Sequence, residues 1–464
     1  MRAKKTVVLN AVGLTPDRIG PETPFLSAYL KEATLRPVQS MLPAVTCSVQ
    51  ATYLTGKQPV DHGIVGNGWY FRDMDEIKFW RQSNRLIQAK KIWEELKERD
   101  PEATTANLFW WYNMNSDVDY LVTPRPIYRS DGVKIPDILT YPMTLRDELQ
   151  DSLGPFPLFK FWGPMTSIES TQWIAEAAKR VEEAYQPTLS LVYLPHLDYN
   201  HQRVGPDHPD SWKDLRDLDR VLEDLIGFFE ERDAHVLLLS EYGIEPVHKP
   251  VHLNRKLREN GYVTVRNEMG GEVLIPGASR AFAVADHQVA HLYIKRSEDV
   301  EPVRHLLSGM DGVEKVLDRE DMKREGLHHE RSGELVAIAE PDAWFTYYYW
   351  LDESCAPDFA PTVDIHTKPG YDPAELLINS DLRMPKLRAA RRLLQKKLGF
   401  RYRMDLVSTR GEGVRGSHGR HSSTPERGPL LITRQSETID RASLAATDVH
   451  DVILDHLFPG TGKT

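Results

Sequence analysis

The chain has little cysteine, no long apolar run and no excess of basic residues. Its 464 residues include only 2 Cys, which excludes a disulfide framework and favours two thiols in a reducing compartment. No segment approaches the roughly 18 continuous apolar residues of a transmembrane helix. With 58 Lys+Arg against 68 Asp+Glu, the formal net charge of −10 gives no electrostatic footprint for nucleic acid or an anionic membrane. We therefore expect a cytoplasmic protein with neither a nucleic-acid polymer nor a membrane as partner.

What the chain does contain is an alternation of apolar strands and amphipathic helices. Apolar runs at residues 6–9, 189–194 and 235–239 predict buried strands, and Asp214–Arg232 keeps apolar residues at helical spacing. Such alternation is typical of an α/β fold with a parallel sheet and helices on both faces. The pattern becomes mixed between residues 247 and 353, which predicts an inserted, smaller α+β subdomain.

Polar residues follow two of the predicted strands at the point where each strand ends. Asp198 comes soon after the second run, and Glu241 directly after the third. In an open α/β sheet, ligands bind beyond the carboxyl ends of the strands. An unpaired carboxylate is costly there, so metal ligands are favoured over helix caps and ion pairs. Histidines lie nearby at His196 and His201, and the last loop of the chain carries His418.

Thr46 opens a helix that the sequence predicts after a proline-containing loop. A hydroxyl at this position is ordinarily an N-cap. The same position also suits a nucleophile that attacks an anion, because the exposed N–H groups and the helix dipole stabilise negative charge. Position alone does not decide between these two interpretations.

The segments AVTCSVQATYLTG and QPVDHGIVGN resemble the nucleophile region of the nucleotide pyrophosphatase/phosphodiesterase branch of the alkaline phosphatase superfamily, to which phosphonoacetate hydrolases are related. The resemblance implies that Thr46 attacks phosphorus and that Asn67 holds a phosphoryl oxygen. Further landmarks occur in the family's order: Asp198 with Gly205-Pro206, Ser240-Glu241-Tyr242-Gly243, and Ser417-His418-Gly419. The resemblance implies an alkaline-phosphatase-like α/β core with a mostly parallel sheet. Residues 1–246 and 354–464 would form this core, and the subdomain at 247–353 would interrupt it.

The resemblance also implies two zinc-like ions. One would be held by Asp198, position 202 and His418, and the other by Thr46, positions 241 and 242, and an Asp after the first strand. This sequence departs from the pattern at four positions. Val12 stands where the family has Asp, with Asn10 as a displaced substitute, and Gln202 stands where the family has His, with His201 adjacent. Glu241 replaces Asp, and Tyr242 replaces His. Fewer imidazoles make the donor set harder, which shifts the expectation from Zn towards Mn, Fe or Mg, or towards a single ion.

Other histidines are candidates to complete the metal site. His287 and His291 share one face of a predicted period-2 strand, and His366 precedes the last core elements. Solvation in polar loops is the alternative for His287 and His366. The helix at Lys386–Lys397 is strongly basic, and we interpret it as a solvated face rather than a nucleic-acid patch.

The predicted function is that of a metal-dependent hydrolase of phosphodiester, pyrophosphate or phosphonate bonds in a small phosphorylated molecule. Thr46 would form a covalent phospho-enzyme, assisted by Asn67 and the N–H groups near Cys47. The predicted metal ligands are Thr46, Asp198, His201, Glu241, Tyr242, His287, His366 and His418. Two alternatives stay open: a phosphoryl or sulfuryl transferase or mutase, and a degenerate, non-catalytic protein that binds a phosphorylated ligand. The sequence leaves the natural substrate and the oligomeric state open.

Overall fold

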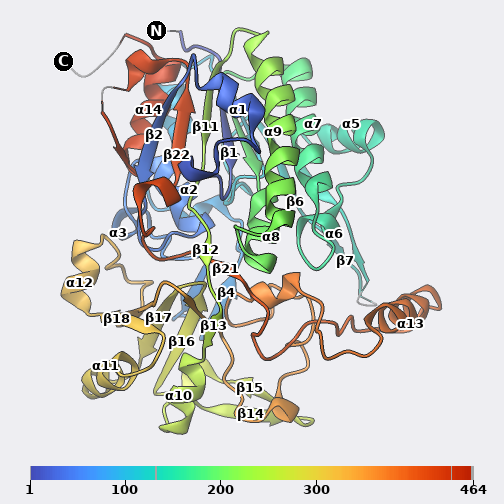
Figure 1. Ribbon diagram of the computed structural model, residues 1–464, viewed down its shortest axis with the longest axis vertical. Helices are drawn as coiled ribbons and strands as arrows, with labels where there is room; N and C mark the ends of the chain where they lie inside the picture. The colour runs from blue at the N-terminus through green and yellow to red at the C-terminus, as the bar shows by residue number, and fades with distance from the viewer. Residues whose placement is uncertain (1, 131–132, 440, 461–464) are drawn as a thin grey trace.

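A nine-stranded, mostly parallel sheet forms the centre of the computed structural model, which describes residues 2–130, 133–439 and 441–460 (Figure 1). Five neighbouring strands, in the order β11-β1-β10-β5-β6, are parallel, and the remaining strands extend both edges of the sheet. From one edge to the other the strands are β23 (Leu444–Ala445), β2 (Thr34–Gln39), β22 (Leu430–Thr433), β11 (His235–Leu239), β1 (Thr6–Ala11), β10 (Leu189–Leu194), β5 (Thr105–Leu108), β6 (Tyr120–Pro124) and β9 (Ile138–Tyr141). The predicted mostly parallel sheet is confirmed.

Helices flank this sheet. The long helices α7 (Ile168–Tyr185) and α9 (Pro209–Glu230) pack against each other and against β10 and β11. α14 (Asp448–Leu457) packs against β1, α2 (Thr46–Thr55) and α4 (Ile92–Arg99). In α9 the buried residues Leu215, Leu218, Leu222 and Leu225 recur at helical spacing, so one face of the helix enters the core.

A second, four-stranded antiparallel sheet lies in the lower half of Figure 1. Its order is β16 (Ala281–Asp286), β17 (Val289–Ile294), β19 (Leu335–Ala339) and β18 (Val313–Leu317). It has its own apolar core, with α10 (Leu253–Glu259), α11 (Val300–Ser308) and α12 (Arg319–Arg324) nearby. The chain then returns to the main sheet through β22. Boundaries at 246/247 and 353/354 stay a proposal.

Shorter elements connect the two sheets or lie at their margins. They are α1 (Pro24–Tyr29), α3 (Pro59–His62), β3 (Gly68–Phe71), β4 (Glu76–Phe79), β7 (Ile127–Tyr128), β8 (Lys134–Ile135), α5 (Thr144–Leu153), α6 (Leu158–Phe161), α8 (His196–Val204), β12 (Glu245–Pro246), β13 (Lys249–Val251), β14 (Val265–Glu268), β15 (Gly271–Leu274), β20 (Ala343–Phe345), α13 (Pro385–Lys397) and β21 (Gly416–Ser417). Across the three described ranges, none of the helices combines the length and apolar character that crossing a bilayer requires. Cys47 and Cys355 are free thiols.

Helix α2 is buried along all ten of its residues, so its polar side chains need internal partners. His62 provides one of them: its Nε2 lies 3.0 Å from Thr52 Oγ1, while its Nδ1 accepts a 3.1 Å hydrogen bond from the Ile64 N–H. An accepting Nδ1 requires the neutral imidazole with its proton on Nε2. Burial, together with the positive charges of His329 and Arg331, lowers the pKa of His62 to about 3.

This buried imidazole predicts a loss of stability in acid. Between pH 6.5 and about 3 the His62 imidazole is protonated in the unfolded chain but stays neutral in the folded chain. The free energy of unfolding should therefore fall with decreasing pH by up to about 1.4 kcal/mol per unit from this residue. The measurement is urea unfolding across that range for the wild type and His62→Gln, whose amide can keep both hydrogen bonds. His305→Gln, on the surface, is the matched control, and equal flattening by both variants would contradict the prediction.

Candidate active site

The candidate site lies at the carboxyl ends of β1, β10 and β11. Asn10 on β1 is level with Tyr193 on β10 and Leu239 on β11. Asp198 follows β10 in the first turn of α8, and Glu241 follows β11. Because these strands are parallel, their ends meet at one edge of the sheet. The structure thus brings together the two carboxylates that the sequence singled out.

Thr46 is the first helical residue of α2, and Val45 occupies the N-cap position. The Thr46 side chain is only 3% exposed, and its Oγ1 lies 3.0 Å from the Tyr242 hydroxyl. The N-cap interpretation of Thr46 is therefore wrong. The hydroxyl faces the carboxyl ends of the strands rather than the N–H groups of its own helix.

Glu241 is held by two amide side chains. Its Oε1 accepts hydrogen bonds of 2.5 Å from both Asn10 Nδ2 and Gln50 Nε2, while Oε2 has no partner among the described residues. Burial raises the pKa of Glu241 to about 8, although these two hydrogen bonds oppose the shift. Sequence reasoning missed Gln50, and its position one helical turn after Thr46 was a signal that could have identified it.

Tyr242 lies between the nucleophile candidate and Asp198. Its hydroxyl donates to Asp198 Oδ1 at 3.4 Å, and its ring stacks on the His418 imidazole at 3.6 Å with an interplanar angle of 7°. Burial raises the pKa of the Tyr242 phenol well above its usual value, so the hydroxyl keeps its proton. Burial also raises the pKa of Asp198 to about 7. The neutral phenol therefore connects Thr46 to Asp198 by hydrogen bonds.

In this region His418 and His287 each have an Nε2 atom without a hydrogen-bond partner among the described residues. His418 Nδ1 lies 2.7 Å from the Ala44 carbonyl oxygen, and His287 Nδ1 lies 2.8 Å from Asp286 Oδ1. A carbonyl or carboxylate acceptor places the proton on Nδ1 and leaves a lone pair on Nε2, the arrangement of a metal-ligating imidazole. The two rings lie 3.7 Å apart, and burial lowers the pKa of each well below its usual value.

Asn67 links α2 to the second sheet. Its Oδ1 accepts the Cys47 N–H at 3.0 Å, and its backbone N–H and Nδ2 donate to the two oxygens of Asp286 at 2.8 and 3.1 Å. The Cys47 N–H, which the sequence assigned to a phosphoryl oxygen, is therefore already occupied. Sequence reasoning noted the Asp286-His287 pair only as a candidate substitute for missing metal ligands; its contact with Asn67 follows from no spacing rule, because the two residues are 219 positions apart.

The structure places three other predicted histidines elsewhere. His201 packs against Gly13 with Arg18, Asp214 and His196 as its charged neighbours, and burial lowers its pKa to about 3. Gln202, rather than His201, approaches Asp198 and accepts a 3.0 Å hydrogen bond from the Tyr371 hydroxyl.

His291 bonds the Val65 carbonyl through Nε2 and the Gly333 N–H through Nδ1. His287 occupies the turn between β16 and β17 with φ of 60°, so the period-2 argument that paired it with His291 is wrong. His366 is exposed, and the charged groups around it are Lys134, Asp364 and Arg81.

The donor set fits one divalent cation better than two. His418 Nε2 lies 3.9 Å from Asp198 Oδ1. One ion with bonds of about 2.0–2.2 Å to each of these two atoms can span that separation. A second ion would need donors around Glu241. There the first-strand position is Val12, one Glu241 oxygen already has two amide partners, and Tyr242 keeps its proton.

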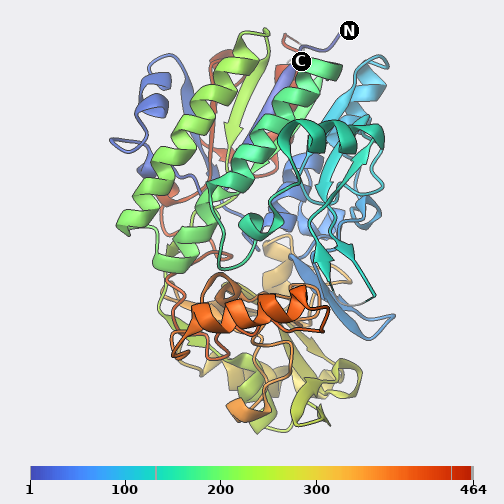
Figure 2. The same ribbon diagram turned by 90° about the vertical axis from the view of Figure 1, so that its right-hand side faces the viewer.

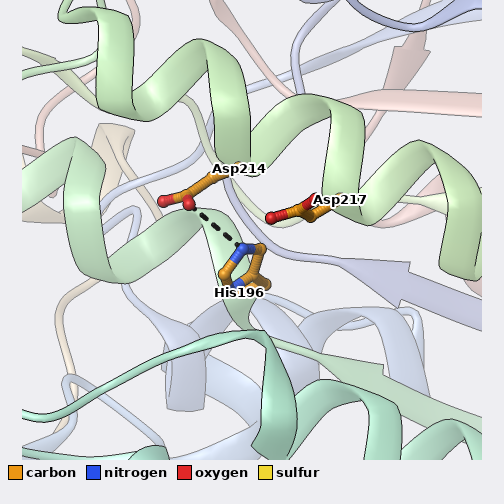
Figure 3. Close-up of side chains that lie close together, drawn as sticks. All are labelled: His196, Asp214 and Asp217. Carbon is orange, nitrogen blue, oxygen red and sulfur yellow. Dashed lines mark ion pairs between the residues drawn. The ribbon is translucent and has the colours of Figure 1, made fainter.

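A separate group of potential metal ligands lies beside the site. Figure 3 shows His196 at the start of α8 facing Asp214 and Asp217 on α9. Among the described residues it is the one group of three or more His, Cys, Asp or Glu whose ligand atoms all lie within 4.8 Å of one another. His196 Nε2 is 3.3 Å from Asp214 Oδ1, but Asp217 already pairs with Lys213 and Arg220. We interpret the group mainly as a contact that fixes α8, and with it Asp198, against α9.

An aromatic wall adjoins the histidines. Tyr371 stacks on His287 at 3.6 Å, and Trp80 and Trp162 lie 6.0 and 5.7 Å from the Tyr371 ring. Trp111 contacts Trp80 at 4.9 Å, and its backbone N–H donates to Gln50. The three tryptophans are half-buried, so this wall provides partly accessible apolar surface next to the polar residues.

Comparison with known proteins identifies matches at the levels of family and fold. A family model described as Type I phosphodiesterase / nucleotide pyrophosphatase matches residues 6–372. An uncharacterized pyrophosphatase/phosphodiesterase of Schizosaccharomyces pombe is 25% identical over 218 residues, which cover 44% of this chain and 37% of that protein. The match therefore spans well under half of the yeast protein's length.

Solved structures share the fold over nearly the whole chain. Phosphonoacetate hydrolase from Sinorhizobium meliloti, in complex with phosphonoformate, has a TM-score of 0.62 and 15% identity, covering 98% of this chain and 96% of that one. An inactive variant of murine ectonucleotide pyrophosphatase / phosphodiesterase 5, in complex with AMP, has a TM-score of 0.58 and 15% identity, covering 98% and 94%. These likenesses confirm the alkaline-phosphatase-like fold class.

The contacts of Asp286 predict a specific cost for its removal. Asp286→Ala leaves two buried donors of Asn67 and one of His287 without an acceptor, which should lower the free energy of unfolding by about 2–3 kcal/mol. The measurement is urea unfolding at constant pH. Asp311→Ala removes an exposed carboxylate that pairs with Lys249 and should cost under about 1 kcal/mol. Similar losses in both variants would contradict this assignment.

Proposed function

The chain belongs to the type I phosphodiesterase / nucleotide pyrophosphatase family, and from this premise we propose that it hydrolyses phosphodiester, pyrophosphate or phosphonate bonds with Thr46 as nucleophile. The observation that carries the proposal is the position of Thr46 at the start of α2, facing Tyr242 and the region of Asp198 and His418. Enzymes that attack phosphorus need such a nucleophile beside groups that stabilise negative charge.

Thr46 would attack phosphorus to form an Oγ1–P bond as the bond to the leaving group breaks. Its hydroxyl proton would pass to Tyr242 as the Tyr242 proton passes to Asp198, and water would then hydrolyse the phospho-threonine. The Tyr242 phenol donates to Asp198, so it accepts the Thr46 hydroxyl proton in the resting hydrogen-bond chain. That contact directs the Thr46 lone pairs away from Tyr242. The N-terminal end of α2 favours the negative charge that develops on the phosphoryl group.

Asn67 would bind a phosphoryl oxygen through its amide nitrogen. One N–H of Nδ2 donates to Asp286, and the second N–H has no partner among the described residues. Asp286 and the Cys47 N–H fix the plane of the amide, so Asn67 needs little reorganisation when substrate binds.

Asp198 and His418 would hold one divalent cation, with His287 and Gln202 close to them. When bound, such a cation acts as a Lewis acid that stabilises negative charge on the reacting oxygens. The Ala44 carbonyl keeps the His418 lone pair on Nε2, which prepares this ligand before the cation arrives.

The substrate would be a small phosphorylated molecule. Phosphonoformate and AMP are the ligands of the two structural neighbours, and an anion of this kind suits the proposed site. The wall of Trp80, Trp111, Trp162 and Tyr371 would contact the part of the substrate that leaves or remains beside the phosphoryl group. A cytoplasmic location remains a prediction from cysteine content.

One observation favours a second candidate, a non-catalytic protein that binds a phosphorylated ligand. Tyr242 stacks on His418 and bonds both Thr46 and Asp198, so it joins three residues that an active enzyme would engage with substrate or cation. Hydrolysis and metal content separate the two candidates.

We expect Thr46→Ala to reduce hydrolysis of a chromogenic phosphodiester by about a thousandfold or more, because the covalent route is lost. Thr46→Ser keeps the hydroxyl and should retain measurable activity. The assay uses wild type and variants after reconstitution with Zn²⁺ or Mn²⁺. Thr55→Ala is the matched control at the other end of the same helix, where the hydroxyl donates to the Ala51 carbonyl and accepts from the Lys57 N–H. Equal activity of Thr46→Ala and wild type would exclude the covalent mechanism.

Metal content provides an independent prediction. After loading and desalting, the wild type should retain about one ion per chain by elemental analysis, and His418→Ala should retain far less. His421→Ala, three residues further along and bonded to the Ser40 carbonyl, is the matched control. A wild type that retains no ion would favour the non-catalytic candidate. Unchanged retention in His418→Ala, with loss in His196→Ala, would move the cation to the group in Figure 3.

A further inference from the structure

Helix α13 presents an apolar stripe to solvent. Figure 2 shows α13 lying lengthwise across the outside of the molecule, and Figure 1 shows it at the right-hand margin, away from the main sheet. Six large apolar side chains in and beside it are between 53% and 66% exposed: Met384, Leu387, Leu393, Leu394, Leu398 and Phe400. Apolar side chains gathered in this way on one surface element mark an interaction site.

The apolar face of α13 points to solvent and its polar face points to the protein, whereas surface helices usually bury their apolar face. Leu387, Leu394 and Leu398 follow one another at intervals of seven and four residues, so they share one face. Arg392 lies about 140° around the helix from Leu387. There it donates two hydrogen bonds of 3.0 Å to the buried carboxylate of Asp405, which also accepts from Arg388. The polar face of α13 is thus anchored to the protein, while its leucines point outward.

Basic residues flank the stripe on both sides. Residues 382–404 contain no Asp or Glu and nine basic residues: Arg383, Lys386, Arg388, Arg391, Arg392, Lys396, Lys397, Arg401 and Arg403. At helical spacing, Lys386 and Lys397 border the leucine face on one side, and Arg391 borders it on the other. Long basic side chains beside an apolar stripe can extend past it to reach anionic groups.

We propose that α13 docks the protein on an anionic phospholipid surface. Its leucines would enter the headgroup–acyl boundary while the flanking Lys and Arg side chains bind lipid phosphates and carboxylates. A basic amphipathic helix with leucine and phenylalanine on one face is typical of such interfacial binding. A second copy of this chain fits less well, because a two-fold contact through α13 would bring the two basic segments against each other.

This proposal departs from the sequence-based expectation that the protein has no membrane partner. That expectation used the net charge of −10, which averages over the chain and conceals a basic segment. The proposal needs no spanning helix, since an interfacial helix lies in the plane of the membrane surface. It is also independent of the proposed hydrolysis, because none of the α13 residues belongs to the candidate active site.

Vesicle co-sedimentation of the full chain tests the proposal. The protein should sediment with phosphatidylcholine vesicles that contain about one-third phosphatidylserine, and much less with phosphatidylcholine alone. Raised salt should weaken the binding, because basic side chains contribute to it. The triple variant Leu387→Ser, Leu394→Ser and Leu398→Ser should bind at least about tenfold more weakly.

The matched control replaces three exposed apolar residues elsewhere, Met74→Ser, Leu351→Ser and Met269→Ser, and should bind like the wild type. Circular dichroism and urea unfolding check that each triple variant is folded. Absence of binding to the anionic vesicles, or equal binding by the α13 variant, would overturn the proposal. So would an α13-dependent dimer or complex with an acidic protein in the absence of any lipid binding. A destabilised α13 variant would be replaced by Lys386→Gln, Arg391→Gln and Lys397→Gln, which should also weaken binding.

Discussion

The burial of two carboxylates at the carboxyl ends of β10 and β11 is the constraint on which the site depends. Asp198 and Glu241 are 8% and 1% exposed, and an unpaired charge is costly at such buried positions. The protein meets this cost differently at each position. Amides of Asn10 and Gln50 hold Glu241. Among the described residues, Asp198 has a long hydrogen bond from Tyr242, the Gln202 amide nearby and His418 Nε2 at 3.9 Å. The more poorly compensated carboxylate is therefore the one that we assign to a cation.

The second sheet contributes residues to this candidate site. Asp286, at the end of β16, accepts hydrogen bonds from Asn67 and from the neighbouring His287, whose ring lies against His418. Residues from α2, the hairpin of the second sheet and the loop that carries His418 are thus fixed against one another. In such a network the position of Asn67 depends on the hairpin turn of the second sheet, so that turn would affect the phosphoryl binding that we propose for Asn67.

Much of the site could be predicted because its residues follow strands or open a helix. The pattern of apolar runs located Asp198 and Glu241, and the nucleophile segment located Thr46. Prediction failed where contacts join distant segments: Asp286 to Asn67, Tyr371 to Gln202, and Gln50 to Glu241. His287 and His201 show the reason. His287 lies in a turn rather than on a strand, and His201 packs beside Gly13, Arg18 and Asp214 rather than against Asp198; residue spacing specifies neither placement.

The sequence by itself determined the parallel sheet, the order of the polar loops and the identity of the nucleophile candidate, because hydrophobic periodicity and short motifs are local properties. Only the tertiary structure decided that Tyr242 occupies the space between Thr46 and Asp198, and that the basic helix α13 turns its leucines to solvent. Both depend on which face of an element meets the rest of the protein. That choice is made by long-range packing and by buried acceptors such as Asp405, which no local pattern specifies.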